Sequence, residues 1–167
     1  MMALADVIAF LEDSTLADSI REGDTLFPVI ESVHVLAISL VIGSILVLDL
    51  RLLGIASLDR PVSRLSRSIL PVTWCAFATA AASGSLLFIA NLTKYLGNGW
   101  FVAKMSLLAL AGLNMIVFHA VTARDLRRWE RNHPPPRSAR LAGLVSIVLW
   151  IAIVTCGRMI GFTLQEL

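Results

Sequence analysis

Four long runs of apolar residues, separated by charged segments, dominate the chain. They cover about residues 27–48, 69–90, 100–122 and 141–162. An α-helix needs about 20 apolar residues to cross a bilayer, so each run is long enough. A shorter stretch, residues 4–22, places apolar residues at helical spacing, and Ser14 is suited to cap its second part. We therefore predict one all-α domain over residues 1–167, a membrane-spanning four-helix bundle. Its short amphipathic N-terminal helices lie on the membrane surface or cover the bundle end.

Composition supports a membrane protein. Hydrophobic residues make up 57% of the chain and charged residues 16%, whereas soluble domains have about 45–50% and about 25%. The lipid bilayer is therefore the first predicted partner. The basic residues lie beside the predicted spans, where they act as orientation signals, so the charge pattern does not favour nucleic-acid binding.

The basic residues also predict how the chain is oriented. Arginines concentrate in residues 51–67 and 124–140, whereas residues 91–99 contain a single lysine, Lys94. Segments rich in lysine and arginine stay in the cytoplasm. We therefore predict a multi-pass protein of the bacterial inner membrane with both termini in the periplasm.

Several ionisable residues fall inside the spans, where such residues are costly and usually face a partner or a cavity. With a rise of 1.5 Å per residue, Glu31 lies roughly 6 Å and His34 roughly 10 Å from the outer end of span one. Lys104 of span three and Arg158 of span four lie within about 6 Å of the same surface. This predicts an outer polar layer in which Glu31 neutralises one of the two cations and the other can receive an anionic group.

A second polar layer is predicted near the cytoplasmic face. Asp49 ends span one, and His119 lies about 28 Å below the outer end of span three. His119 faces the bundle at helical spacing from Lys104, and Asn114 lies beside that stripe. An Asp49–His119 pair is one prediction, and a histidine at the membrane interface is the other.

The histidines raise two cofactor hypotheses. The first is haem b. His34 and His119 are candidate axial ligands, but a separation of roughly 18 Å prevents them from sharing one haem within a chain. His34 with Met159 is the alternative pair, and Arg158 and Lys104 suit the propionates. The second is copper, with His34, Cys156 and Met159 as ligands. No hydrolytic or nucleophilic motif is present. If the protein takes part in an enzymatic reaction, the sequence therefore predicts at most the role of an electron-transfer subunit.

Four segments carry a family resemblance: LFPVIESVHVL, GSILVLDLRLLG, KMSLLALAGLNMIVFH and GRMIG. They resemble an uncharacterised bacterial family of four-span membrane proteins, a domain of unknown function, over nearly the whole chain. The pattern is more distantly similar to copper-resistance D proteins and small b-type cytochromes. That resemblance implies possible ligand roles for His34 and His119. Two haems with two histidines each would need four intramembrane histidines, and this chain lacks them.

Three functions therefore remain open from the sequence. The first is a haem-binding, redox-linked membrane subunit. The second is a transporter for copper or another small solute, using Glu31, His34, Cys156 and Met159. The third is a structural or accessory subunit of a larger membrane complex. Small residues on spans one and two favour close helix packing and also permit a homo-oligomer: Ser32, Ser39, Gly43, Ala76, Ala80, Ser83 and Gly84.

Overall fold

The computed structural model describes residues 4–122 and 135–164, and this part of the chain contains helices and no strands. Four helices are long and apolar enough to cross a membrane, which confirms the predicted bundle and makes the chain a multi-pass membrane protein. The elements are α1 Leu4–Glu12, α2 Thr15–Glu22, α3 Leu26–Leu53, α4 Val62–Ala90, α5 Leu92–Gly97, α6 Gly99–Val117, the π-helical turn η1 Phe118–Thr122, and α8 Arg137–Thr163.

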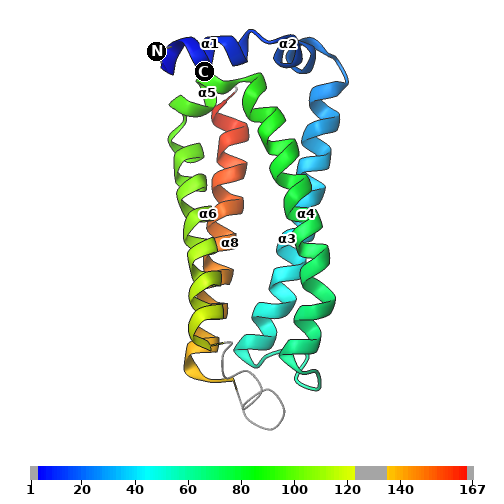
Figure 1. The fold of residues 1–167 in the computed structure, drawn as a ribbon, viewed down its shortest axis with the longest axis vertical. Coiled ribbons are helices and arrows are strands. Elements are labelled where there is room, and N and C mark those ends of the chain that lie inside the picture. The colour runs from blue at the N-terminus through cyan, green and yellow to red at the C-terminus, as the bar shows by residue number, and fades with distance from the viewer. Residues whose placement is uncertain (1–3, 123–134, 165–167) are drawn as a thin grey trace.

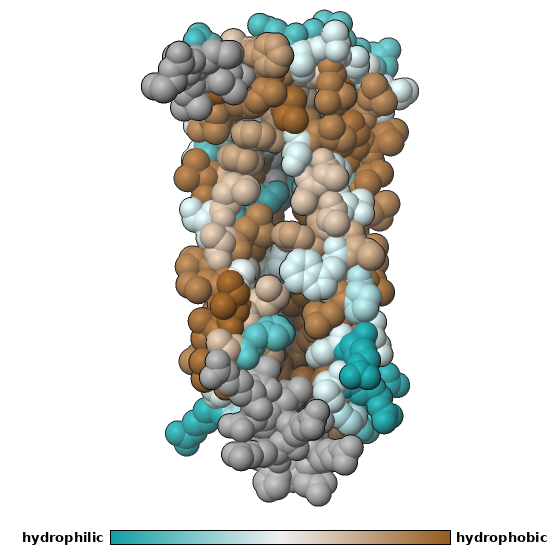
Figure 2. All heavy atoms as spheres, in the orientation of Figure 1, coloured by the Kyte–Doolittle hydropathy of each residue, from teal (hydrophilic) through white to brown (hydrophobic). Residues whose placement is uncertain are grey.

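The bundle consists of two helix pairs (Figure 1). α3 packs mainly against α4 and α6 mainly against α8, while α3 also contacts α8 and so joins the pairs. Figure 2 shows apolar atoms around the middle of the bundle, hydrophilic atoms toward both ends and a hollow between the pairs. We call the end that carries α1, α2 and α5 the upper end, as it is drawn in Figure 1.

Small side chains allow α3 and α4 to pack closely. Ala76, Ala80 and Ser83 of α4 are buried, as the small-residue pattern of span two predicts. The Thr73 hydroxyl donates a hydrogen bond to the Ser44 hydroxyl of α3 at 2.8 Å. The small residues predicted for the packing face of span one, however, do not meet another helix. Ser32, Ser39 and Gly43 are exposed, because α3 turns His34, Ala37 and Val41 toward α4 instead.

The α3–α8 crossing depends on Gly143. A Cβ atom at this position would lie 3.0 Å from the Asp49 carbonyl oxygen and 3.2 Å from the Leu52 Cβ. Both distances are shorter than ordinary van der Waals contacts, so a side chain here would push α8 away from α3. This glycine therefore sets the separation of the two pairs in the lower half.

The helices continue beyond the apolar runs at the lower end. α3 extends to Leu53, where Gly54 takes a left-handed conformation (φ 77°) and caps the helix. α4 begins at Val62, seven residues before the predicted span. Buried Arg51 donates a hydrogen bond from Nε to the Arg60 carbonyl at 2.9 Å and closes the intervening turn. Hydropathy identifies only the part of a helix that lies in the lipid. The helix itself continues into the charged residues at either end of that part, because their long side chains can reach water.

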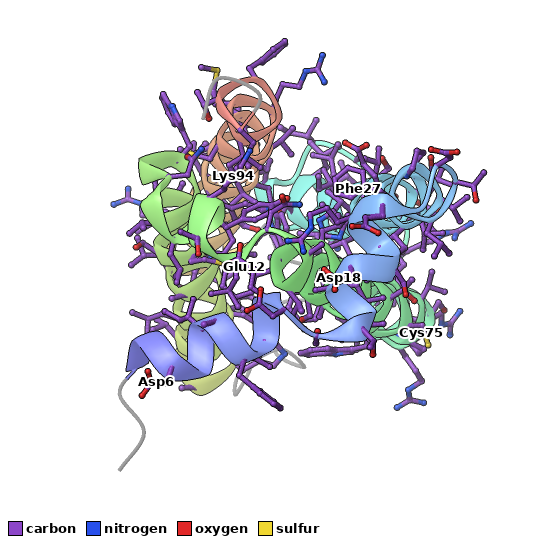
Figure 3. The ribbon with its side chains drawn as sticks, turned by 90° about the horizontal axis from the view of Figure 1, so that it is seen from above. Asp6, Glu12, Asp18, Phe27, Cys75 and Lys94 are labelled. Carbon is purple, nitrogen blue, oxygen red and sulfur yellow. The ribbon has the colours of Figure 1, made fainter. Side chains whose placement is uncertain are left out.

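The N-terminal helices lie across the upper end (Figure 1). Ser14 caps α2 as predicted, since its Oγ accepts from the Ala17 N–H at 3.2 Å. Ala17 and Ile20 are buried where α2 meets α3 and α4. Glu12 accepts a hydrogen bond from the Thr93 hydroxyl of α5, and Figure 3 shows its place near the centre of this end. Phe10 remains 72% exposed. The segment thus covers the bundle and also presents an apolar edge suited to a membrane surface.

Candidate functional site

A cavity of about 740 Å³ lies between the two helix pairs in the upper half. Three of the four predicted outer-layer residues line it: Glu31 and His34 from α3 and Lys104 from α6. Most of its wall is apolar, with aromatic side chains from α3, α4, α6 and α8: Phe27, Phe77, Phe88, Phe101 and Trp150. The upper cavity therefore combines a few polar groups with apolar walls, as small-molecule sites usually do.

His34 is the most constrained polar group in the upper cavity. Its Nδ1 lies 2.9 Å from the Ala80 carbonyl oxygen and 3.1 Å from the Ser83 hydroxyl of α4. A carbonyl oxygen only accepts hydrogen bonds, so Nδ1 carries the proton, and in the neutral ring Nε2 keeps its lone pair. No described residue hydrogen-bonds Nε2. The imidazole is thus oriented by its Nδ1–H, the arrangement typical of histidines that ligate metals.

Gly84 provides the space for this imidazole. A Cβ atom at position 84 would lie 2.8 Å from His34 Cε1 and 3.3 Å from Nδ1. Real Cβ atoms essentially never approach so closely, so only glycine leaves room for the ring beside α4. The sequence indicated Gly84 as a packing residue, but it gave no sign that the packing partner is His34.

Lys104 brings a positive charge to the upper cavity without an acidic partner. Its side chain lies along α8, with Nζ 3.7 Å from the position that a Cβ at Gly157 would take. The described residues form two ion pairs, Arg21–Asp18 and Arg60–Asp59, and neither involves Lys104 or Glu31. The predicted neutralisation of Lys104 by Glu31 is therefore not formed. The ammonium remains available to an anionic group.

α5 contributes two cavity residues that sequence analysis missed, Lys94 and Tyr95. Lys94 was assigned only to a loop, because a six-residue helix between two spans leaves too short a pattern to detect. Burial raises the pKa of the Tyr95 hydroxyl, and the Glu31 carboxylate raises it further. Tyr95 and Glu31 therefore belong to the same polar region at the upper end of the cavity.

The predicted residues of α8 do not join the upper cavity. The Arg158 guanidinium lies 4.4 Å from the centroid of the Phe162 ring, and the residue is exposed. Cys156 is buried and Met159 half-buried, but neither lines a cavity. α8 presents Ile153, Gly157 and Ile160 instead. The residues that line the upper cavity beside His34 therefore do not include Arg158, Cys156 or Met159.

The two cysteines are free. Cys75 is exposed at the periphery of the bundle (Figure 3), whereas Cys156 is buried in α8. Among residues 4–122 and 135–164, no group of three histidine, cysteine or acidic side chains is arranged to hold a metal ion.

A second cavity, of about 290 Å³, lies in the lower half. Asp49, Asn114 and His119 line it, so the predicted deeper layer is brought together. His119 donates from Nδ1 to the Met115 carbonyl at 2.8 Å, and Asn114 donates to the Ala142 carbonyl at 3.0 Å. In the described part of the chain His119 and Asp49 form no ion pair. The two intramembrane histidines therefore belong to different cavities.

Comparisons with known proteins identify a family but no activity. A family of unknown function, DUF6644, matches residues 21–163, which include all four spans and every cavity-lining residue except Leu164. No curated protein and no solved structure matches the chain.

Proposed function

We propose that this chain, which belongs to the family of unknown function DUF6644, is a haem-b-binding, redox-linked membrane subunit whose haem occupies the upper cavity. His34 would hold the haem iron through Nε2. Following the arginine-rich segments, we assign the protein to the bacterial inner membrane with both termini in the periplasm. Bound haem supplies one-electron chemistry, and the chain supplies the ligand, the dry walls and the charges.

One observation carries the proposal: the His34 imidazole is already in the state that iron requires. Its Nδ1–H is held by the Ala80 carbonyl, and Nε2 has no partner among the described residues. Gly84 leaves space for the imidazole on the facing helix, so the ring is held in one place. Orientation by a backbone carbonyl fixes both the tautomer and the direction of the lone pair.

The walls and charges of the upper cavity suit the rest of a haem. The volume of about 740 Å³ and the aromatic lining can exclude water from an apolar macrocycle. The propionates are carboxylates and need cations or water. Lys104 has no acidic partner and Lys94 lies at the upper end of the same cavity, so these two lysines are the propionate partners that we propose. Arg158, predicted for this role, lies on another face of α8 beside Phe162.

The test is the visible spectrum of the detergent-purified protein, oxidised and dithionite-reduced, after expression with ample haem. We expect a Soret band in the wild type and in His119→Ala, and none in His34→Ala. His119 is the matched control because it is the other intramembrane histidine and lines the lower cavity. A wild type without a Soret band would overturn the proposal and favour a structural subunit. A band retained by His34→Ala would overturn the ligand assignment.

A further inference from the structure

The lower cavity contains a buried carboxylate that the proposed haem site does not use. Asp49 is 6% exposed, and it lines this cavity from the lower part of α3. Its Oδ2 is fully buried and has no hydrogen-bond partner among the described residues. The Ser146 hydroxyl of α8 is its polar neighbour. A buried acid with an unsatisfied oxygen is costly, so a compensating group is expected at this position.

No basic side chain of the described residues compensates Asp49. The nearest arginine in sequence, Arg51, is directed to the Arg60 carbonyl. Among the residues that line the lower cavity, His119 is the other titratable side chain. Its Nδ1–H is committed to the Met115 carbonyl, which leaves Nε2 as an acceptor in the neutral ring. The lower cavity therefore contains an acid without a basic partner among the described residues, whereas the upper cavity contains a lysine without an acidic partner.

Aromatic rings from three parts of the fold surround the same space. Trp74 and Phe77 come from α4, where they form an edge-to-face pair with centroids 6.0 Å apart. Phe118 comes from η1, and Trp150 from α8. The faces of such rings attract cations, and tryptophan attracts them most strongly. A small inorganic cation would want several oxygen ligands, whereas a carboxylate among aromatic rings suits an organic ammonium.

We propose that the lower cavity is a binding site for a compact organic cation, an ammonium with apolar substituents, which is neutralised by Asp49 and enclosed by these rings. The volume of about 290 Å³ limits the occupant to one small molecule or one headgroup. Gly143 keeps α8 close to the Asp49 backbone, so the carboxylate is held at the cavity wall. This site is separate from the proposed haem site and does not depend on it.

Calorimetric titration with two ligands of similar shape and opposite charge tests the site. Benzyltrimethylammonium is the cation and phenylmethanesulfonate the anion. We expect the wild type to bind the cation at least about tenfold more tightly than the anion, because the carboxylate attracts one and repels the other. Equal affinities, or no saturable binding of the cation up to millimolar concentrations, would overturn the proposal. This comparison needs only the wild-type protein, so it holds even if variants fold poorly.

Two variants then locate the binding. Asp49→Asn keeps the shape of the side chain and should weaken cation binding at least about tenfold. Glu31→Gln removes the acid of the upper cavity and should leave the affinity unchanged. Loss of binding in Glu31→Gln with retention in Asp49→Asn would overturn the assignment to the lower cavity.

A choline lipid offers the same ammonium as a free amine, and the surrounding lipid separates the two sources. Titrations in phosphatidylcholine and phosphatidylethanolamine nanodiscs compare two zwitterionic surfaces, of which only the first offers an ammonium with apolar substituents. Weaker binding in phosphatidylcholine would identify a lipid headgroup as the occupant, and equal binding would identify a free amine. Both results are consistent with a cation-binding site in the lower cavity.

Discussion

The two cavities of this bundle differ in size, in the sign of their charge and in the chemistry that they can accept. The upper cavity is about 740 Å³ and contains Lys104 without an acidic partner beside an oriented imidazole. The lower cavity is about 290 Å³ and contains Asp49 without a basic partner. One helix, α3, supplies the key residue of each. A membrane bundle can therefore keep opposite charges apart in its two halves instead of pairing them.

Packing explains why the charges do not pair. Val41, Phe77, Leu108 and Trp150 line both cavities, so apolar side chains separate them. Each key residue of α3 lies opposite a glycine: Gly84 of α4 for His34, and Gly143 of α8 for Asp49. The upper glycine makes room for a ring within the α3–α4 pair, whereas the lower glycine brings α8 close to the α3 backbone and so holds the two pairs together below.

The largest expected effect is on the α3–α8 contact of the lower half. In Gly143→Leu the new side chain meets the Asp49 carbonyl and the Leu52 Cβ. We expect a loss of about 2–3 kcal/mol in the free energy of unfolding, because overpacking forces the backbones apart. Gly161→Leu on the same helix is the control, since nothing lies within 4 Å of its Cβ position. Chemical unfolding in detergent measures both, and equal losses would show that Gly143 is not a packing constraint.

The upper half should respond to a single methyl group. In Gly84→Ala the added Cβ would lie 2.8 Å from His34 Cε1, so the ring must rotate or shift and its Nδ1–H bond to Ala80 weakens. If His34 ligates haem, we expect a weaker or shifted Soret band. Gly112→Ala, on the wall of the lower cavity with nothing within 4 Å, should leave the spectrum unchanged. An unaltered spectrum in Gly84→Ala would show that the imidazole does not need this space.

A smaller effect is expected from the unpaired charge of the upper cavity. Lys104→Met keeps the length of the side chain and removes an ammonium that has no acidic partner among the described residues. In the haem-free protein we expect a gain on the order of 1 kcal/mol in the free energy of unfolding, since burying an unpaired charge is costly. Lys94→Met is the control, because Lys94 is exposed. A destabilised Lys104→Met protein would imply that the ammonium has a partner that the cavity geometry does not reveal.

The smallest effect is expected at Glu31. The sequence predicted that Glu31 neutralises Lys104 or Arg158, and loss of such an ion pair in Glu31→Gln would destabilise the fold. The structure shows Glu31 exposed and outside the two ion pairs of the described residues. We therefore expect a change below about 0.5 kcal/mol in the free energy of unfolding, as for most surface substitutions. A thermal unfolding curve measures this change. A loss of stability above about 1 kcal/mol would support the ion pair that the sequence predicted.

The sequence predicted the four helices, the Ser14 cap and the membership of Glu31, His34 and Lys104 in one layer, because length, hydropathy and rise per residue determine depth. It did not predict correctly which side chains of each helix face the neighbouring helices. Arg158 is at the predicted depth but lies against Phe162, and Ser32 and Gly43 are exposed. Those outcomes depend on which face of one helix meets another. The sequence could not reveal the roles of Gly84 and Gly143 for the same reason, because each glycine contacts a residue that lies far away in the sequence.

The most direct test of the central claim is the amount of haem bound per chain in three proteins. The wild type and Asp49→Asn should each contain one haem per chain, because the lower carboxylate is not part of the upper cavity. His34→Ala should contain none. Haem in all three proteins, or in none of them, would contradict the claim that the two halves of the bundle carry separate chemistry and that His34 defines the upper half.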